Sequence, residues 1–257
     1  MTELPGDARL RIDDELVRWA VDGRPATADE AVAALGTRPL VLLMHGFGSF
    51  EGDLIGLAPG LPAGVVCASP RAPLVVPPPV VNGFAWWPLT FGPDGLVVPE
   101  ADPAEFAGSA PHLAAVAVLD WLDALDARVR EAEGTGGTGL GAVVPMGFSQ
   151  GGCMATSLLR LRPERFACAV NCSGFVAPGA YAGDAGLAAI RPPLFWGRDP
   201  EDPVIGPSRI ALTEQWAPAH TRLEARLYSG VAHGIAAEEV ADISAFIERE
   251  LARAGGR

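Results

Sequence analysis

A serine stands at a turn that the sequence places between a buried strand and a helix. An apolar run at residues 143–146 leads into Gly-Phe-Ser-Gln-Gly, centred on Ser149, and a helical stretch follows over residues 151–162. A residue on so sharp a turn takes a strained backbone conformation, so the positions two before and two after it must lack bulk. The pattern therefore predicts a serine whose hydroxyl is exposed at the carboxyl edge of a sheet.

The rest of the chain alternates between expected strands and helices. Helices are expected over residues 110–132 and 236–253, where apolar residues recur at helical spacing, and over residues 151–162 directly behind the serine. Nearly continuous apolar runs are typical of parallel strands that are covered on both faces. These runs occupy residues 40–44, 65–68, 142–146, 169–172, 193–196 and 223–228. The alternation predicts an α/β fold with a mostly parallel central sheet and helices on both faces.

Other segments depart from this alternation. Residues 8–21 alternate apolar and polar around Asp13 and Asp14, which predicts an N-terminal antiparallel hairpin. Residues 70–109 are rich in proline and residues 173–192 in glycine and alanine, and such insertions are typical of lids or binding loops. A length of 257 residues suits one α/β domain spanning residues 1–257.

Composition excludes several classes of function. The net charge of −12 argues against binding to nucleic acid or to anionic membranes. All 19 basic residues are arginine, which excludes Schiff-base lysines, Ser-Lys dyads and P-loops. No apolar run reaches the roughly 18 residues of a membrane span. The N-terminus shows neither the basic region nor the apolar core of a secretion signal, so we expect a cytoplasmic protein.

The four cysteines are expected to be buried free thiols. They are Cys67, Cys153, Cys168 and Cys172, and their spacing is unlike that of a disulfide-rich secreted domain. Cys168 and Cys172 have the spacing of a possible metal pair, but no second pair and no nearby histidine completes a site. We therefore expect no metal and no cofactor.

A nucleophilic serine needs a base within hydrogen-bond reach, and the base is itself held by a carboxylate. Where the serine lies on a strand-to-helix turn, the acid and then the histidine follow it along the chain. Only His220 and His233 follow Ser149. His233 comes just after the last expected strand, at the carboxyl edge where Ser149 lies, whereas His220 precedes that strand. This position favours His233 as the base.

The candidate acids follow the strand expected at residues 193–196. Asp202 is followed by Pro-Val-Ile, which would fix the loop and pack it against the sheet, and this favours Asp202. Asp199 lies closer to the end of the strand and is the alternative. The decision between them depends on geometry and not on spacing along the chain.

The oxyanion of the tetrahedral intermediate requires a pair of N–H donors. Gln150 follows the nucleophile at the start of a helix and supplies the first. The loop after the strand at residues 40–44 reads His-Gly-Phe-Gly and supplies the second, for which we favour Phe47, with Gly46 or Gly48 as alternatives. His45 is expected to brace this loop through a hydrogen bond.

These motifs together resemble the phospholipase/carboxylesterase branch of the α/β-hydrolases, which includes acyl-protein thioesterases and small bacterial carboxylesterases. The resemblance implies an α/β-hydrolase fold with Ser149, Asp202 and His233 as nucleophile, acid and base. One departure from the family pattern is the segment from Gly197 to Asp202 that holds the candidate acid, which is longer than the usual Gly-x-x-Asp. The matching segments follow the family order between about residues 38 and 250: they are residues 45–48, 69–73, 83–87, 147–152, 202–205 and 233–234.

Two adjacent tryptophans, Trp86 and Trp87, lie outside every expected element. One interpretation is that they plug the core beneath the long loop. The other is that they bind substrate, and the resemblance favours Trp86 as a wall of the acyl pocket with Phe84 beside it. An indole there would shorten the space for the acyl chain and would favour short or medium acyl groups.

The sequence thus predicts a serine hydrolase that cleaves carboxylic esters or thioesters of short to medium acyl chains through an acyl-enzyme. The expected partner is a small-molecule ester or thioester, and the protein is expected to be a monomer or a homodimer. One alternative is an acyltransferase that uses the same three residues. Another is a non-catalytic binding protein on a hydrolase scaffold, because a fold alone does not settle function.

Overall fold

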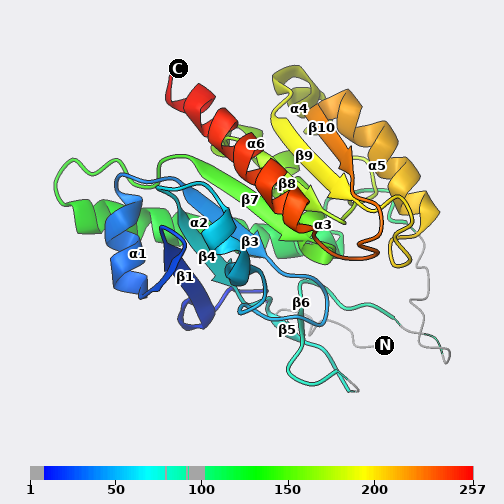
Figure 1. Ribbon diagram of the computed structural model, residues 1–257, viewed down its shortest axis with the longest axis horizontal. Coiled ribbons are helices and arrows are strands. Elements are labelled where there is room, and N and C mark those ends of the chain that lie inside the picture. Colours follow the sequence, from blue (N-terminus) through cyan, green and yellow to red (C-terminus); the bar gives the residue numbers. More distant parts are fainter. Residues whose placement is uncertain (1–8, 79, 91, 93–101, 257) are drawn as a thin grey trace.

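The computed structural model describes residues 9–78, 80–90, 92 and 102–256. Within them, one large sheet has the strand order β10-β9-β8-β7-β3-β4-β1-β2, and β5 pairs with β6 apart from it (Figure 1). Neighbouring strands from β10 to β4 are parallel, while β1 is antiparallel to both β4 and β2. The strands are β1 (Val17–Val21), β2 (Arg24–Ala26), β3 (Leu40–Met44), β4 (Val66–Pro70), β5 (Leu74–Val75), β6 (Phe84–Ala85), β7 (Val143–Phe148), β8 (Ala169–Cys172), β9 (Pro193–Arg198) and β10 (Arg222–Leu227).

Helices cover both faces of the sheet, and α6 crosses the near side in Figure 1 while α2 and α3 lie behind it. Successive residues of β3 point to opposite faces of the sheet. Leu42 belongs to the apolar core that includes residues of helices α1 to α5, and Leu43 belongs to the core that includes residues of α6. None of the helices in the described part of the chain is both long and apolar enough to cross a membrane. The helices are α1 (Ala28–Leu35), α2 (Ala110–Glu133), α3 (Gln150–Leu161), α4 (Asp184–Ile190), α5 (Pro207–His220) and α6 (Ala237–Gly255), with 3₁₀ turns at Asp14–Leu16, Leu54–Gly60 and Pro163–Arg165.

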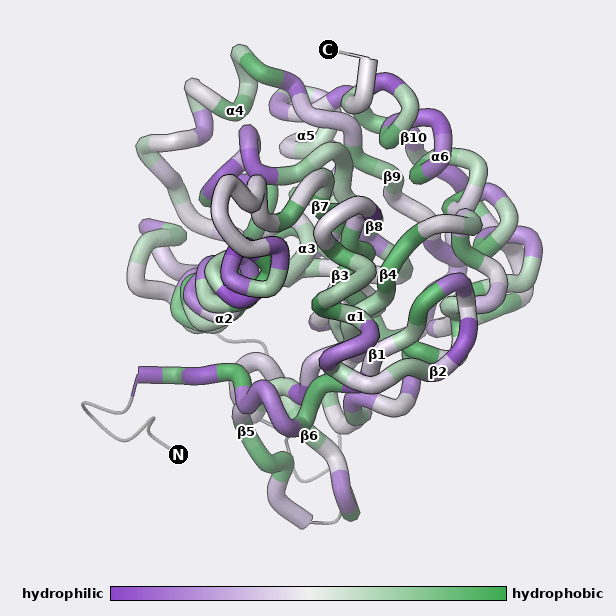
Figure 2. The backbone as a smooth tube through the Cα atoms, turned by 90° about the vertical axis from the view of Figure 1, so that its left-hand side faces the viewer, coloured by the Kyte–Doolittle hydropathy of each residue, from purple (hydrophilic) through white to green (hydrophobic). Residues whose placement is uncertain are grey.

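The predicted α/β architecture is confirmed, and each of the six predicted parallel strands is present within two residues of its expected bounds. All five residues of β3 are buried, as expected of a strand covered on both faces. Figure 2 shows green, apolar chain in the central strands and a mixture of hydrophilic and apolar residues along α2. The four cysteines are buried and free, as predicted, and burial raises the pKa of Cys67 and Cys153 to about 12.

The N-terminal hairpin exists, but its predicted position was wrong. Asp13 caps a 3₁₀ turn, because its carboxylate accepts a hydrogen bond from the backbone N–H of Glu15 at 3.0 Å. The hairpin of β1 and β2 instead turns at Asp22 and Gly23, whose φ angles are 51° and 72°. An Asp-Gly pair with both φ angles positive matches the right-handed twist of paired strands, so the turn forms there.

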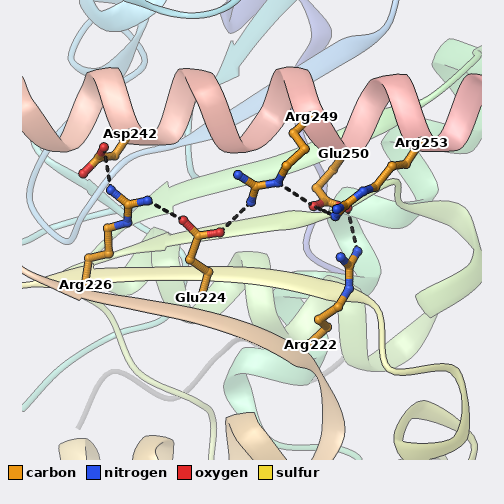
Figure 3. Close-up of polar contacts among 7 residues, drawn as sticks. All are labelled: Arg222, Glu224, Arg226, Asp242, Arg249, Glu250 and Arg253. Atoms are coloured by element: carbon orange, nitrogen blue, oxygen red, sulfur yellow. Dashed lines mark hydrogen bonds and ion pairs between the residues drawn. The ribbon is translucent and has the colours of Figure 1, made fainter.

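A network of ion pairs attaches α6 to the edge strand β10 (Figure 3). The carboxylate of Glu250 is nearly buried and lies within 3.2 Å of the guanidinium groups of Arg222, Arg249 and Arg253. Glu224 joins Arg249 to Arg226, and Arg226 reaches Asp242 on α6. Charged side chains along an edge strand also oppose its pairing with another chain.

A second carboxyl group of α6 is buried without such compensation. Glu239 has no exposed surface, and its Oε2 accepts a hydrogen bond from the N–H of Ala236 at 3.4 Å. Burial raises the pKa of Glu239 to about 7 because the apolar surroundings penalise the charged form. In the unfolded chain this carboxyl loses its proton near pH 4.5, so the folded state is destabilised progressively as the pH rises from there to about 7.

We therefore expect Glu239→Gln to stabilise the protein at pH 8. The gain should reach up to about 3 kcal/mol, because each pKa unit corresponds to about 1.4 kcal/mol, and it should shrink as the pH falls toward 4.5. Urea denaturation at pH 5 and pH 8 measures it. Glu238→Gln, at the exposed neighbouring position, is the control and should change little at either pH. An equal gain from Glu239→Gln at both pH values would contradict a titrating Glu239.

Candidate active site

Ser149 lies between the end of β7 and the start of α3, with φ of 55° and ψ of −114°. Such a conformation is strained for any residue with a Cβ, and the surrounding backbone must hold it. The Ser149 N–H donates to the carbonyl oxygen of Cys172 at 2.9 Å, which ties the turn to β8. The candidate nucleophile is thus fixed at the carboxyl edge of the parallel sheet.

The glycines on either side of Ser149 are required by close backbone contacts. A Cβ atom at Gly147 would lie 2.0 Å from the carbonyl oxygen of Gly151. A Cβ atom at Gly151 would lie 1.8 Å from the carbonyl oxygen of Met44 at the end of β3. No side chain fits at either distance, so both positions of the Gly-x-Ser-x-Gly pattern have the steric role that the sequence predicted.

His233 and Asp202 lie together. His233 is on the loop between β10 and α6, and its Nδ1 is 2.7 Å from Oδ2 of Asp202, on the loop after β9. The other carboxylate oxygen, Oδ1, accepts hydrogen bonds from the N–H groups of Val204 at 2.8 Å and Ile205 at 3.1 Å. A neutral imidazole that donates through Nδ1 presents Nε2 as a proton acceptor, which is the arrangement a general base needs.

The ring of His233 also packs against the residue before the candidate nucleophile. Its centroid is 4.8 Å from that of Phe148, the last residue of β7. Ser173, on the loop after β8, donates a hydrogen bond to the carbonyl oxygen of Gly234 at 3.1 Å. The structure therefore brings the loop of His233 to the edge where Ser149 lies.

The alternative residues have other surroundings. Asp199 accepts hydrogen bonds from three backbone N–H groups, of Glu201, Val231 and Ala232, each at 2.8 Å. His220 ends α5 just before β10, where its ring stacks on Trp216 at the opposite edge of the sheet. Asp202 and His233 are thus the acid and histidine that the structure pairs.

The candidate oxyanion donors lie on two segments that meet at Ser149. Gln150 is the first residue of α3, and Phe47 is on the loop after β3. A Cβ atom on Gly46 would be 3.5 Å from the Cβ of Ser149, so this loop lies against the serine. The N–H of Gly48 donates to the carbonyl oxygen of Phe84 at 2.9 Å, which argues against Gly48 as an oxyanion donor.

His45 braces this loop. Its Nδ1 lies 2.8 Å from the carbonyl oxygen of Gly46, and its Nε2 accepts a hydrogen bond from the N–H of Ala72 at 3.1 Å. These two contacts require a neutral ring with its proton on Nδ1. Burial lowers the pKa of His45, which keeps the ring neutral.

The tryptophan pair is held by a residue whose side chain the sequence did not single out. Gln150 accepts a hydrogen bond from the N–H of Trp86 and donates to the carbonyl oxygen of Trp87, both at 2.9 Å. The Trp86 indole N–H donates to the carbonyl oxygen of His45 at 2.9 Å. The sequence did contain a signal for this role of Gln150, because a polar side chain at the start of a buried helix needs hydrogen-bond partners.

Burial separates the two interpretations of Trp86. Its side chain has no exposed surface, and Trp87 is 8% exposed. An indole without exposed surface forms no wall of an open pocket. The structure thus favours the core position for Trp86 over the predicted substrate contact, because the indole fills space beneath the long loop and its N–H has a partner there.

No group of three or more His, Cys, Asp or Glu side chains among the described residues could hold a metal ion. The arrangement that the structure does offer is a strained serine, a histidine bonded to a carboxylate, and backbone N–H groups beside the serine. Such a set is suited to nucleophilic attack on a carbonyl carbon.

A model of the phospholipase/carboxylesterase family matches residues 31–251. No curated protein sequence matches significantly. Solved structures share the α/β-hydrolase fold, among them a carboxylesterase from Mesorhizobium loti (TM-score 0.65, 16% identity, 94% of this chain and 99% of the other). The carboxylesterase of Bacillus cereus has a TM-score of 0.62 at 16% identity, covering 95% of this chain and 96% of the other. Arabidopsis thaliana SOBER1 L63A has a TM-score of 0.61 at 20% identity, covering 84% of this chain and 100% of the other.

Proposed function

Since this chain belongs to the phospholipase/carboxylesterase family of hydrolases, we propose that it is a serine hydrolase that cleaves carboxylic esters or thioesters through an acyl-enzyme. The observation that carries the proposal is the 2.7 Å hydrogen bond from His233 Nδ1 to Asp202, at the edge of the sheet where Ser149 takes its strained conformation. This combination offers a histidine oriented by a carboxylate and a half-buried serine at the same edge of the sheet.

In the proposed reaction, the Ser149 hydroxyl attacks the carbonyl carbon and His233 Nε2 accepts its proton. Asp202 holds the Nδ1 proton and stabilises the imidazolium that forms. The N–H groups of Phe47 and Gln150 stabilise the oxyanion. His233 then gives the proton to the leaving alkoxide or thiolate, and a water molecule releases the acid from Ser149 by the same steps.

The expected preference for short or medium acyl chains depended on an indole in the acyl pocket. The side chain of Trp86 has no exposed surface, which argues against that role. We therefore propose the ester and thioester chemistry without a limit on chain length. A panel of p-nitrophenyl esters of increasing chain length, assayed beside acyl-thioesters, defines the preference.

Labelling with a fluorophosphonate tests the proposal directly. The reagent should form a covalent adduct at Ser149, identified by mass spectrometry of the digested protein, and hydrolysis of esters should stop in proportion to labelling. Absence of an adduct would support the non-catalytic binding protein instead. Transfer of the acyl group to an added alcohol in preference to water would identify an acyltransferase.

A further inference from the structure

Two loops leave neighbouring strands at the edge of the sheet that holds Ser149. We call residues 199–206, after β9, the acid loop, and residues 228–236, after β10, the base loop. Strands β9 and β10 are parallel neighbours, so the loops begin side by side. The N–H of Tyr228 donates to the carbonyl oxygen of Arg198 at 2.9 Å, which extends the pairing up to the start of both loops.

The carboxylate of Asp199 joins the two loops beyond that point. Its Oδ1 accepts a hydrogen bond from the N–H of Glu201, in the acid loop. Its Oδ2 accepts from the N–H groups of Val231 and Ala232, in the base loop. All three bonds are 2.8 Å long, and the side chain is buried, with Asp199 2% exposed. Hydrogen bonds from N–H groups to an ionised carboxylate are stronger than those between neutral groups.

One of these bonds acts on the residue directly before His233. Ala232 has φ of 52°, in the left-handed region that residues with a Cβ rarely take. The N–H of Ala232 is one of the two that Asp199 Oδ2 accepts, so the bond stabilises this conformation. The conformation of Ala232 sets the direction in which the chain presents His233.

The backbone N–H groups around Asp199 lower its pKa from the ordinary value, so the carboxylate stays ionised at neutral pH. Asparagine would not replace it. The amide has one accepting oxygen, and its NH₂ group would face either the N–H of Glu201 or the N–H groups of Val231 and Ala232. One of the two loops would therefore lose its attachment.

We propose that Asp199 is a positioning residue that fixes the base loop against the acid loop and so sets the distance between His233 and Asp202. The inference rests on the proposed function, in which those two residues work as a pair. Asp199 itself touches no reacting atom. Its contribution is geometric, and a misplacement of about 1 Å at a catalytic group can cost on the order of 100-fold in rate.

The test compares Asp199→Asn with wild type in the full-length protein. We expect kcat for p-nitrophenyl acetate to fall roughly 10- to 100-fold, with KM changed less than about twofold. A purely structural role would lower Tm but leave kcat of the folded protein unchanged.

Asp126→Asn is the matched control. Asp126 also accepts a backbone N–H, that of Leu140 at 2.7 Å, and pairs with Arg130, but at the opposite edge of the sheet. It should reduce Tm without changing kcat. If Asp199→Asn does not fold, Asp199→Ser gives the same comparison, because its smaller side chain leaves room for water at the backbone N–H groups.

Wild-type kcat in a folded Asp199 variant would overturn the proposal. So would failure of both Asp199 variants to fold while Asp126→Asn folds, because Asp199 would then be needed for the fold itself. The fluorophosphonate adduct separates this from the proposed function. If Ser149 is labelled and Asp199→Asn keeps full activity, only the positioning role fails, whereas an unlabelled Ser149 removes the hydrolase proposal.

Discussion

Replacement of Ser149 by alanine is expected to abolish ester hydrolysis and to leave the melting temperature nearly unchanged. Loss of a serine nucleophile costs on the order of 10⁶-fold in kcat in enzymes of this type. Alanine adds no bulk to a turn at which φ is 55°, and the backbone bond from residue 149 to Cys172 remains possible. Steady-state kinetics with a p-nitrophenyl ester and a thermal melt measure the two effects.

Ser149→Gly is the informative companion variant. It removes the nucleophile equally but also relieves the strained conformation, which costs about 1–3 kcal/mol for a residue with a Cβ. We therefore expect it to be as inactive as Ser149→Ala and to melt at a higher temperature. Activity within tenfold of wild type in either variant would refute Ser149 as the nucleophile.

Much of the fold was predictable because the central strands carry an unambiguous pattern. Residues 40–44 and 169–172 were predicted with the bounds that β3 and β8 have, since strands covered on both faces read as short apolar runs. Helices α2 and α6 were also predicted, because each carries a stripe of apolar residues at helical spacing. Helix α3, which is buried along nearly its whole length, was predicted from its position after the turn at Ser149. These elements fix the position of the turn at Ser149.

The elements that the sequence analysis missed are short or weakly amphipathic. Helix α1 has eight residues and begins at a capping box in which Thr27 and Glu30 exchange hydrogen bonds, a local signal that was present in the sequence. Helix α4 lies within the segment at residues 173–192, where glycine and alanine hide its periodicity. Helix α5 contains Pro218, which argues against a helix in isolation. Tertiary packing decides all three.

In the candidate site, local pattern was sufficient for some residues and not for others. His233 was favoured over His220 because the loops that follow the strands of a parallel sheet gather at one edge. The surroundings of Asp199 could not be predicted, because spacing along the acid loop shows neither which carboxylate faces His233 nor which faces the backbone of the base loop. The burial of Trp86 likewise depends on Gln150, 64 residues away along the chain.

Replacement of Asp202 by asparagine should lower kcat by roughly 10⁴-fold. The structure gives the reason in detail. Oδ1 of Asp202 accepts two backbone N–H groups, of Val204 and Ile205, while Oδ2 faces His233 Nδ1. In the variant the amide oxygen is expected to keep the two backbone donors, which leaves the NH₂ group facing the histidine. His233 would then accept at Nδ1 and carry its proton on Nε2, the tautomer that cannot take a proton from Ser149.

The pH profile and the comparison with Asp199→Asn make this result specific. Asp202→Asn should lose kcat across the neutral range and should recover some rate at high pH, where a Ser149 alkoxide no longer needs a base. Asp199→Asn should cost roughly 10- to 100-fold, because it loosens a loop and leaves the imidazole tautomer unchanged. The ratio of the two losses therefore separates the carboxylate that bonds the histidine from the one that holds its loop. If the larger loss comes from Asp199, then the carboxylate that serves His233 during turnover is Asp199, and the 2.7 Å contact between Asp202 and His233 is not the one that catalysis uses.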